Sequence, residues 1–386
     1  MSCESFVNGE GFYNRLHLKS IMQILNLLHM KKNMIAVLTI VSIVFQYCSG
    51  KDAVTTNTST TNNTIPVTTN TARTPTLPST PYSYANQGLP SHIAQVLAAQ
   101  DNTPADNPVT DHGATLGRVL FYDVQLSKTN TISCSSCHQP ALSFSDSAVK
   151  SKGFAGGLTN RHSMPLVNLR FYKSGKMFWD ERAATLEQQV LMPVQDMTEM
   201  GLTLDELQQK VAAQSYYPAL FQNAFGSTQV TSERIAKALA QFLRSIVTTQ
   251  AKYDLVKQGQ AQFTPDEAAG ENLFLNAGNI TCAACHTPPM FITSSPAAAF
   301  GLPDATDQGI NGTRAFKSSS LRNVANTAPY FHNGSVRSLQ NMLAGTNGAI
   351  PQHTVAPRDV QRLLAFMQTL TDGTSILQEK YSNPFK

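Results

Sequence analysis

Apolar residues recur at helical spacing along most of the chain beyond residue 84, whereas strand-like alternation of apolar and polar residues is scarce. Polar residues mark several expected helix starts: Ser232, Thr203 with Glu206, and Thr264 before Pro265. Two stripes each predict the buried face of one helix: Ile235, Leu239, Phe242, Leu243 and Ile246, and Val360, Leu363, Leu364, Met367 and Leu370. The pattern predicts an all-α fold.

The N-terminal part has the features of an export signal. Lys31 and Lys32 precede an apolar run over residues 34–45, which is too short to span a bilayer and fits the core of a signal peptide. We therefore expect residues 30–50 to be a signal peptide and the protein to be periplasmic. Residues 1–29 would then be an upstream extension, and a genuine N-terminal segment is the alternative.

Cys48 stands where a lipoprotein would carry its modified cysteine. The preceding residues Phe45, Gln46 and Tyr47 suit that processing poorly. We favour ordinary cleavage near Gly50, and a lipid anchor at Cys48 is the alternative.

Residues 51–83 are dominated by Thr, Asn, Ser and Pro and contain few bulky apolar residues. Such a composition cannot bury enough apolar surface to fold, so we expect a disordered linker. Folded structure should begin near Tyr84. Beyond it we expect two haem domains, of residues 84–250 and 251–386, whose long loops are rich in Gly, Ser and Pro.

The charge balance gives little information about partners. The formal net charge is only +4, and no run of Lys and Arg is dense enough to predict a nucleic-acid surface. We expect no nucleic-acid partner.

Four of the six cysteines form two Cys-x-x-Cys pairs, and a histidine follows each pair directly. The first motif is Cys134, Cys137 and His138, and the second is Cys282, Cys285 and His286. This spacing lets two thiols bond the vinyl groups of one porphyrin while the histidine binds its iron. Two covalently bound c-type haems are therefore expected. Zinc ribbons are the alternative, but they need four ligands for each metal ion.

Three further segments accompany the haem motifs in a fixed order. Residues 178–200 include Phe-Trp-Asp-Glu-Arg-Ala, residues 320–324 read Ser-Leu-Arg-Asn-Val, and residues 327–334 read Thr-Ala-Pro-Tyr-Phe-His-Asn-Gly. Together with the haem motifs they resemble the bacterial di-haem cytochrome c peroxidase and MauG family over about residues 84–373. The resemblance implies two cytochrome-c-like haem domains, the N-terminal one peroxidatic and the C-terminal one transferring electrons.

By this resemblance, Glu199 and Gln189 lie above the first haem. Peroxide cleavage needs a group that moves a proton between the two oxygens, and a carboxylate with a raised pKa can do this. Pro193 would shape the helix end nearby, and Trp179 would carry electrons between the haems. The alternative to these roles is that Glu199 and Gln189 lie on exposed helix faces. For Trp179, the alternative is a purely structural position in the core.

Two residues of the second domain also match family positions. His332 corresponds to a histidine near the region between the haems, although a structural role is nearly as plausible. Arg322 would pair with a haem propionate, and a bracing role in a turn is the alternative.

Two positions depart from the family pattern. His162 stands where the family has a calcium-binding Asn, which weakens a calcium site that also uses backbone oxygens of Thr327 and Pro329. We interpret His162 as replacing that Asn, and a displaced sixth iron ligand is the alternative. Thr346 stands where the second haem takes a Met or Tyr ligand, so we expect Met342 to replace it, although a packed core methionine is equally consistent.

The expected activity is reduction of hydrogen peroxide to water with electrons from a small cytochrome c or a cupredoxin. A MauG-like oxidase acting on a protein substrate and a non-catalytic di-haem electron carrier are the alternatives. A homodimer is also consistent with the resemblance.

Overall fold

The computed structural model describes residues 73–276, 282–293, 306–346 and 353–385. The expected upstream extension, the signal peptide and Cys48 lie outside these residues. No helix in the described ranges is both long enough and apolar enough to cross a membrane.

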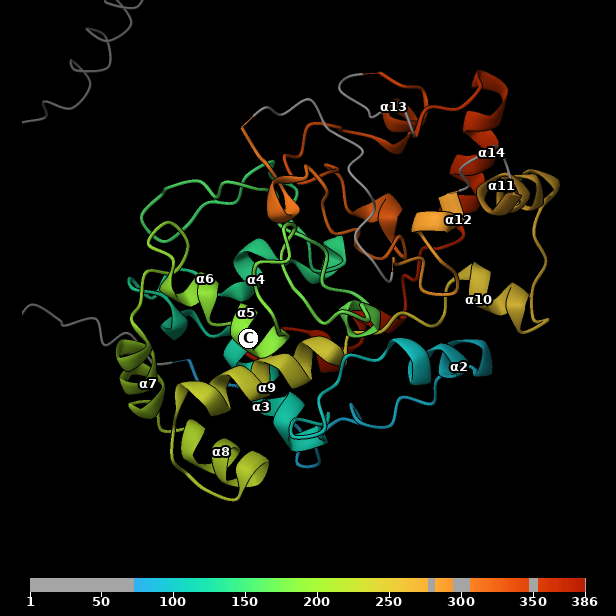
Figure 1. The fold of residues 1–386 in the computed structure, drawn as a ribbon. Coiled ribbons are helices and arrows are strands. Elements are labelled where there is room, and N and C mark those ends of the chain that lie inside the picture. The colour runs from blue at the N-terminus through green and yellow to red at the C-terminus, as the bar shows by residue number, and fades with distance from the viewer. Residues whose placement is uncertain (1–72, 277–281, 294–305, 347–352, 386) are drawn as a thin grey trace, which may run out of the picture. The chain divides into compact units, whose positions relative to one another are not determined.

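Helices and loops build the described part of the chain, which contains isolated bridges but no strand. The expected all-α fold is confirmed. The α-helices are α2 (Ser91–Gln100), α3 (Asp111–Tyr122), α4 (Cys134–Cys137), α5 (Leu186–Gln189), α6 (Met192–Gln195), α7 (Leu204–Ala212), α8 (Tyr217–Phe225), α9 (Ser232–Arg244), α10 (Lys252–Lys257), α11 (Pro265–Asn276), α12 (Cys282–Cys285), α13 (Leu339–Leu343) and α14 (Pro357–Gln368) (Figure 1). Short 3₁₀ turns lie at Val124–Leu126, Pro140–Leu142, Leu169–Phe171, Ile310–Gly312, Val324–Asn326, Ser375–Leu377 and Glu379–Tyr381.

Most of the predicted helix starts are confirmed. Thr203 and Glu206 form the capping box of α7, and α11 begins at Pro265. The cap expected at Ser232 is wrong by one residue. Thr231 caps α9, because its hydroxyl accepts the Arg234 N–H and Ser232 is already helical.

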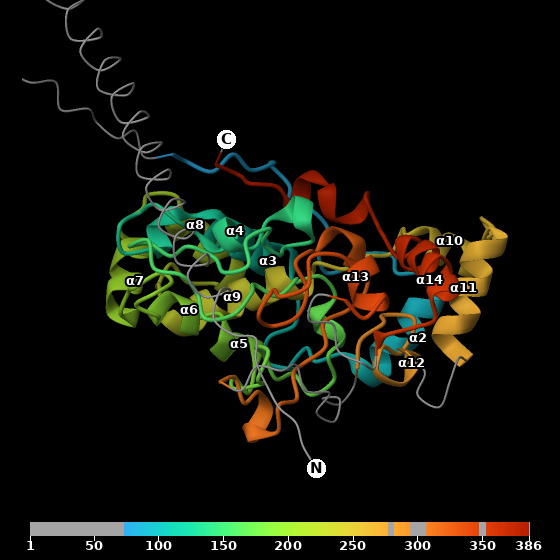
Figure 2. The ribbon, with the colours of Figure 1, turned by 90° about the horizontal axis from the view of Figure 1, so that it is seen from above.

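Two hydrophobic clusters lie at opposite ends of the described fold (Figure 2). The first is formed largely by α3, α8 and α9, and the second by α11, α13 and α14. Both predicted apolar stripes are buried, apart from Leu364, which is only partly buried. The C-terminal residues Ile376, Tyr381 and Phe385 return to the first cluster, so residues after 375 pack with the N-terminal half of the chain.

The same helix crossing occurs once in each half. A Cβ on Gly117 of α3 would lie 2.0 Å from the Ala238 carbonyl oxygen of α9. A Cβ on Gly270 of α11 would lie 2.0 Å from the Arg362 carbonyl oxygen of α14. Only glycine allows two helix backbones to approach so closely. Each crossing supports a Cys-x-x-Cys helix, because α3 contacts α4 and α11 contacts α12.

Folded structure begins before Tyr84. The Thr76 N–H donates to the Pro384 carbonyl at 2.8 Å, and Leu77 and Tyr82 pack against the first cluster. Residues 73–83 of the expected linker are therefore ordered, because their apolar side chains cover the C-terminal segment. The remainder of that linker lies outside the described residues.

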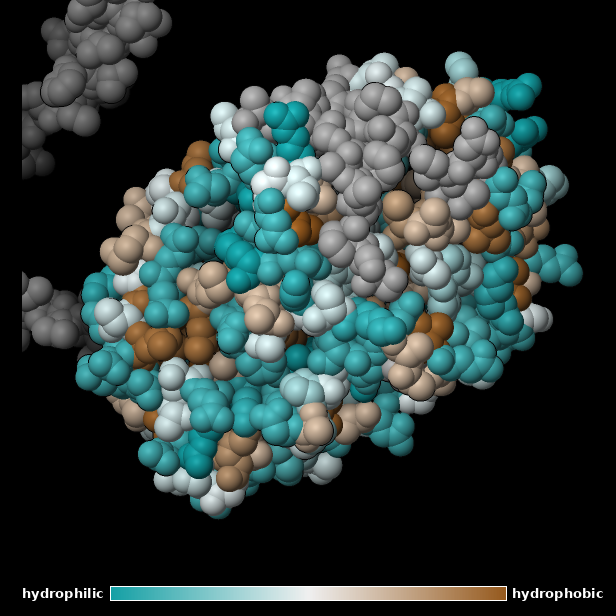
Figure 3. Space-filling view, viewed as in Figure 1, coloured by the Kyte–Doolittle hydropathy of each residue, from teal (hydrophilic) through white to brown (hydrophobic). Residues whose placement is uncertain are grey.

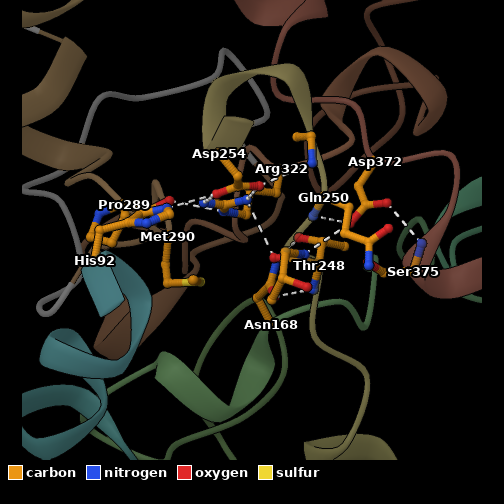
Figure 4. Close-up of polar contacts among 12 residues, drawn as sticks. His92, Asn168, Thr248, Gln250, Asp254, Pro289, Met290, Arg322, Asp372 and Ser375 are labelled. Carbon is orange, nitrogen blue, oxygen red and sulfur yellow. Dashed lines mark hydrogen bonds and ion pairs between the residues drawn. The ribbon is translucent and has the colours of Figure 1, made fainter. Parts of the chain in front are cut away.

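A buried polar network joins the two halves (Figure 4). Arg322 is fully buried and donates to the two carboxylate oxygens of Asp254 at 2.7 and 2.8 Å. It also donates to the carbonyls of Thr248 and Pro289, and His92 contacts Asp254 at 2.9 Å. The guanidinium therefore braces the connection near residue 250, and its pairing with a haem propionate stays a prediction.

The face seen in Figure 3 is mostly hydrophilic. Apolar residues are scattered over it in small groups and do not form one large patch. The large apolar residues that are exposed, on any face of the described chain, are Val124, Leu158, Met197 and Leu377. Scattered single residues of this kind are ordinary on a protein surface.

We predict that Gly117→Ala destabilises the fold by about 1–3 kcal/mol, because the new methyl group would overlap a backbone oxygen that cannot move freely. Gly373→Ala is the matched control, since a Cβ there meets nothing within 4 Å. Chemical denaturation of both variants measures the difference. Equal free energies of unfolding would contradict the close helix crossing.

We predict that Asp254→Asn lowers the free energy of unfolding by about 3–5 kcal/mol, because it leaves the buried Arg322 charge without its counter-ion. Asp106→Asn is the control, since Asp106 pairs with Lys237 at the surface and should cost about 0–1 kcal/mol. Thermal unfolding monitored by circular dichroism compares the two. A loss no larger than the control's would show that the network does not brace the junction.

Candidate active site

The first Cys-x-x-Cys-His motif forms a short helix that presents two unoxidised thiols and an oriented histidine. Cys134 and Cys137 make no disulfide, and burial raises the pKa of Cys134 to about 12 and that of Cys137 to about 11. His138 Nδ1 lies 2.8 Å from the Phe144 carbonyl oxygen. Since that carbonyl accepts the Nδ1 proton, Nε2 keeps the lone pair that can bind a metal. Burial also lowers the pKa of His138, which favours the neutral ring.

The second motif repeats this arrangement. Cys282 and Cys285 in α12 are likewise unoxidised, and the partly buried His286 has its Nδ1 3.0 Å from the Ser318 hydroxyl. Burial lowers the pKa of His286 to about 3, and the Phe291 carbonyl also faces its ring. Phe144 and Phe291 both adopt positive φ, of 60° and 53°. The same backbone device therefore aims a carbonyl at each histidine.

These donor sets fit covalent haem better than zinc. Within the described ranges, no three His, Cys, Asp or Glu side chains converge so that they could hold a metal ion. Each motif instead offers two free thiols and one histidine nitrogen, which are the groups that attach and ligate a c-type haem. His138, Cys282, Cys285 and the remaining motif residues lie where the sequence predicted a cofactor site, and ligation itself stays a prediction.

A cavity of about 750 Å³ opens beside His138. This volume falls in the range of cofactor pockets. Gln189, Pro193 and Glu199 line the cavity together with His138, and so do Trp179, Lys317 and His332 from the region between the two halves. The structure therefore brings together the residues that the sequence analysis assigned to the peroxidatic site.

Glu199 is held on a rigid loop that follows α6. Its N–H donates to the Asp196 carbonyl, and its own carbonyl accepts the Phe154 N–H at 2.9 Å. Gly153 lies against this loop so closely that a Cβ would fall 1.6 Å from the Thr198 carbonyl oxygen. Burial, assisted by the charge of Asp196, raises the pKa of Glu199 to about 6.

Gln189 and Pro193 belong to two short consecutive helices. Gln189 ends α5, whose first turn is capped by Thr185, and its side chain is partly buried. Pro193 lies in the first turn of α6, so it shapes the beginning of that helix and not its end.

Trp179 lies between the two halves. Its Nε1 donates to the His162 carbonyl at 2.7 Å, and its own carbonyl accepts the Lys317 N–H at 2.7 Å. Its ring meets the His332 ring edge-on, with centroids 6.5 Å apart. These contacts fix the only tryptophan of the chain against residues from both halves.

His162 has partners of its own. Its Nδ1 lies 3.0 Å from the Ala148 carbonyl, and its Nε2 lies 3.3 Å from the Ser145 hydroxyl. The ring is therefore held by the loop after the first motif. A calcium site at Thr327 and Pro329 stays a prediction, and nitrogen is a poor donor for this ion.

A histidine that the sequence analysis missed, His353, lies near the second motif. The His353 ring lies 6.4 Å from the His286 ring and 5.9 Å from the Phe331 ring, measured between centroids. Burial lowers the pKa of His353 to about 4. Met342 is buried in the second hydrophobic cluster, and Thr346 is exposed.

Gly153, Phe144 and Phe291 were also missed. Each acts through its backbone, so its side-chain chemistry gave no signal. A phenylalanine soon after each Cys-x-x-Cys-His motif is a repeated feature of the sequence that could have indicated Phe144 and Phe291. His353 had no local motif, because it lies far from His286 along the chain.

Comparisons with known proteins agree with this geometry. The family model described as di-haem cytochrome c peroxidase matches residues 111–262. The methylamine utilization protein MauG of Methylorubrum extorquens is 32% identical over 289 residues, which cover 69% of this chain and 80% of that protein. The cytochrome c551 peroxidase of Nitrosomonas europaea is 32% identical over 297 residues, which cover 72% of this chain and 86% of that protein.

Solved structures give the same result. A MauG-like protein associated with microbial copper homeostasis superposes with a TM-score of 0.67 and 27% identity, over 78% of this chain and 99% of that one. The diheme peroxidase BthA of Burkholderia thailandensis has a TM-score of 0.60 and 21% identity, over 72% of this chain and 91% of that one, which shows the fold alone. This family carries two c-type haems and reacts with a peroxide and an electron donor. The chain belongs to the di-haem cytochrome c peroxidase and MauG family.

Proposed function

We propose that the protein is a periplasmic peroxidase that reduces hydrogen peroxide to water with electrons from a small cytochrome c or cupredoxin. The observation that carries this proposal is the shared cavity of His138, Gln189 and Glu199, in which burial raises the pKa of the carboxyl to about 6. A general base near neutral pH is the group that peroxide cleavage requires.

The balance of the reaction is one peroxide, two electrons and two protons giving two waters. The bound haems would supply an iron that binds peroxide and would together take up its two oxidising equivalents. The Glu199 carboxylate would accept a proton from the inner peroxide oxygen and return it to the outer oxygen, which leaves as water. The Gln189 amide would hold the peroxide in line for this transfer.

The distal side of the first site should stay open to peroxide. His162, the expected alternative sixth ligand, has its two ring nitrogens next to the Ala148 carbonyl and the Ser145 hydroxyl. Moving it to the iron would break both contacts. We therefore propose that the first haem needs no reductive activation.

Trp179 would pass electrons from the second haem to the first. Its position between His162 and Lys317 supports this role, because its indole is fixed at the boundary between the halves.

The backbone oxygens of Thr327 and Pro329 would hold calcium only with water completing the coordination shell, because His162 is not an oxygen donor.

A MauG-like oxidase acting on a protein substrate is the second candidate. Relatives named MauG and relatives named cytochrome c551 peroxidase are equally similar to this chain, at 32% identity. Steady-state turnover of peroxide with a reduced small cytochrome c separates the two. A rate no faster than that of free haem would favour the oxidase.

We predict that Glu199→Gln lowers kcat/KM for peroxide by about 10²–10⁴-fold, because the amide cannot accept the proton. In the native protein the rate should fall as pH drops through about 6, since protonation removes the active carboxylate. The variant should lose this acid limb. Glu233→Gln, at an exposed carboxylate of α9, is the matched control and should keep both the rate and the pH profile.

We predict that Trp179→Phe slows turnover with the electron donor but leaves the initial reaction with peroxide unchanged. The reason is that the indole would carry electrons between the haems but takes no part in the proton transfer that cleaves the O–O bond. Stopped-flow absorbance resolves the first step, and steady-state donor oxidation gives the second. An unchanged donor rate in a variant with a native unfolding midpoint would exclude the relay.

A further inference from the structure

The separation of His286 and His353 matches a pair of histidines bound to one metal. Their ring centroids lie 6.4 Å apart, with an angle of 41° between the planes. An iron held by two imidazoles through bonds of about 2 Å places the ring centres about 6 Å apart. A stacked pair lies much closer, as Phe316 and His332 do at 3.7 Å with an angle of 8°.

Each of the two imidazoles has one ring nitrogen that could bond to a metal. The Ser318 hydroxyl contacts His286 Nδ1, which leaves Nε2 for a metal. His353 Nδ1 is buried and has no hydrogen-bond partner among the described residues. A buried polar atom of this kind is costly unless something outside the protein chain orients or satisfies the ring.

His353 is held in place by the end of α13. The next residue but one, Val355, donates its N–H to the Leu343 carbonyl at 2.9 Å. The side chain of Thr354 lies so close to Gly345 that a Cβ there would fall 2.6 Å from its hydroxyl oxygen. The two residues that follow His353 are therefore anchored to the end of α13 and to Gly345.

Met342, the ligand expected from the sequence, is buried in the second hydrophobic cluster. Thr346 is exposed, and its hydroxyl donates to the Asn341 carbonyl at 3.3 Å.

We propose that His353 is the second axial ligand of the haem attached at Cys282 and Cys285, opposite His286. The bond would form between an imidazole nitrogen of His353 and the iron, with no change of oxidation state and no other reactant. Because an imidazole replaces the thioether that raises the potential of c-type haems, this haem would have a lower potential than a methionine-ligated one.

The inference deepens the proposed function, since it assigns the electron-transferring haem a ligand pair. A lower potential makes this haem easier to oxidise, which suits it to hold one of the two oxidising equivalents from peroxide. Ligation does not depend on turnover, so it can be tested in a protein that proves inactive with peroxide.

The experiment uses the exported holoprotein with both haems attached and compares it with His353→Gly, His353→Met and Met342→Leu. Electron paramagnetic resonance of the ferric proteins reports the spin state of each iron, and potentiometric titration gives the potentials. The native protein should show one low-spin haem without the far-red absorption of an iron–methionine bond. His353→Gly should convert that haem to high spin, and added imidazole should restore low spin.

His353→Met should raise the potential of the low-spin haem and introduce the far-red absorption, whereas Met342→Leu should change neither. Haem content measured after denaturation and the high-spin signal of the first haem show that each variant is folded. Loss of the low-spin signal in Met342→Leu, or its persistence in His353→Gly, would overturn the proposal. So would two high-spin irons in the native protein. Failure of peroxide turnover alone would count only against the proposed function.

Discussion

The contact between His138 and the Phe144 carbonyl is the constraint on which the chemistry of the first site depends. An imidazole has two nitrogens, and the partner of one decides which is left for a metal. This carbonyl points at the ring because Phe144 adopts a φ of 60°, a strained conformation that costs about 1–3 kcal/mol. The fully buried side chain of Phe144 packs in the first hydrophobic cluster, and that packing offsets the strain. The core thus orients the ligand.

The second half uses the same physical solution with different residues. Gly270 takes the role of Gly117 at the helix crossing, and Phe291 takes that of Phe144 beside the histidine. In each half a helix pair crosses at a glycine and contacts a short Cys-x-x-Cys helix. A bound haem would add apolar volume to each half, so long loops around each motif would wrap a cofactor as well as a core of side chains.

The sequence predicted the features whose chemistry lies in side chains or in periodicity. The all-α fold, the starts of α7 and α11, and the buried stripes of α9 and α14 follow from local patterns. The gathering of Gln189 and Glu199 around His138 followed from the resemblance. Contacts between distant segments could not be read in this way. Arg322 meets Asp254, and His353 meets His286, only after the chain has folded, and Gly153 acts on Glu199 through steric contact with its loop.

The two sites differ in the groups that the described residues place beside their proximal histidines. Beside His138 the chain keeps a cavity of about 750 Å³ and supplies a carboxyl whose burial favours proton transfer near neutral pH. Beside His286 it places a second imidazole at the spacing of a shared metal ion. An iron with an open position binds small oxidants, whereas one with two protein ligands exchanges electrons with little rearrangement. Trp179 is held between residues of both halves. Under the proposed function, the division of labour between the two haems would follow from the distal group at each.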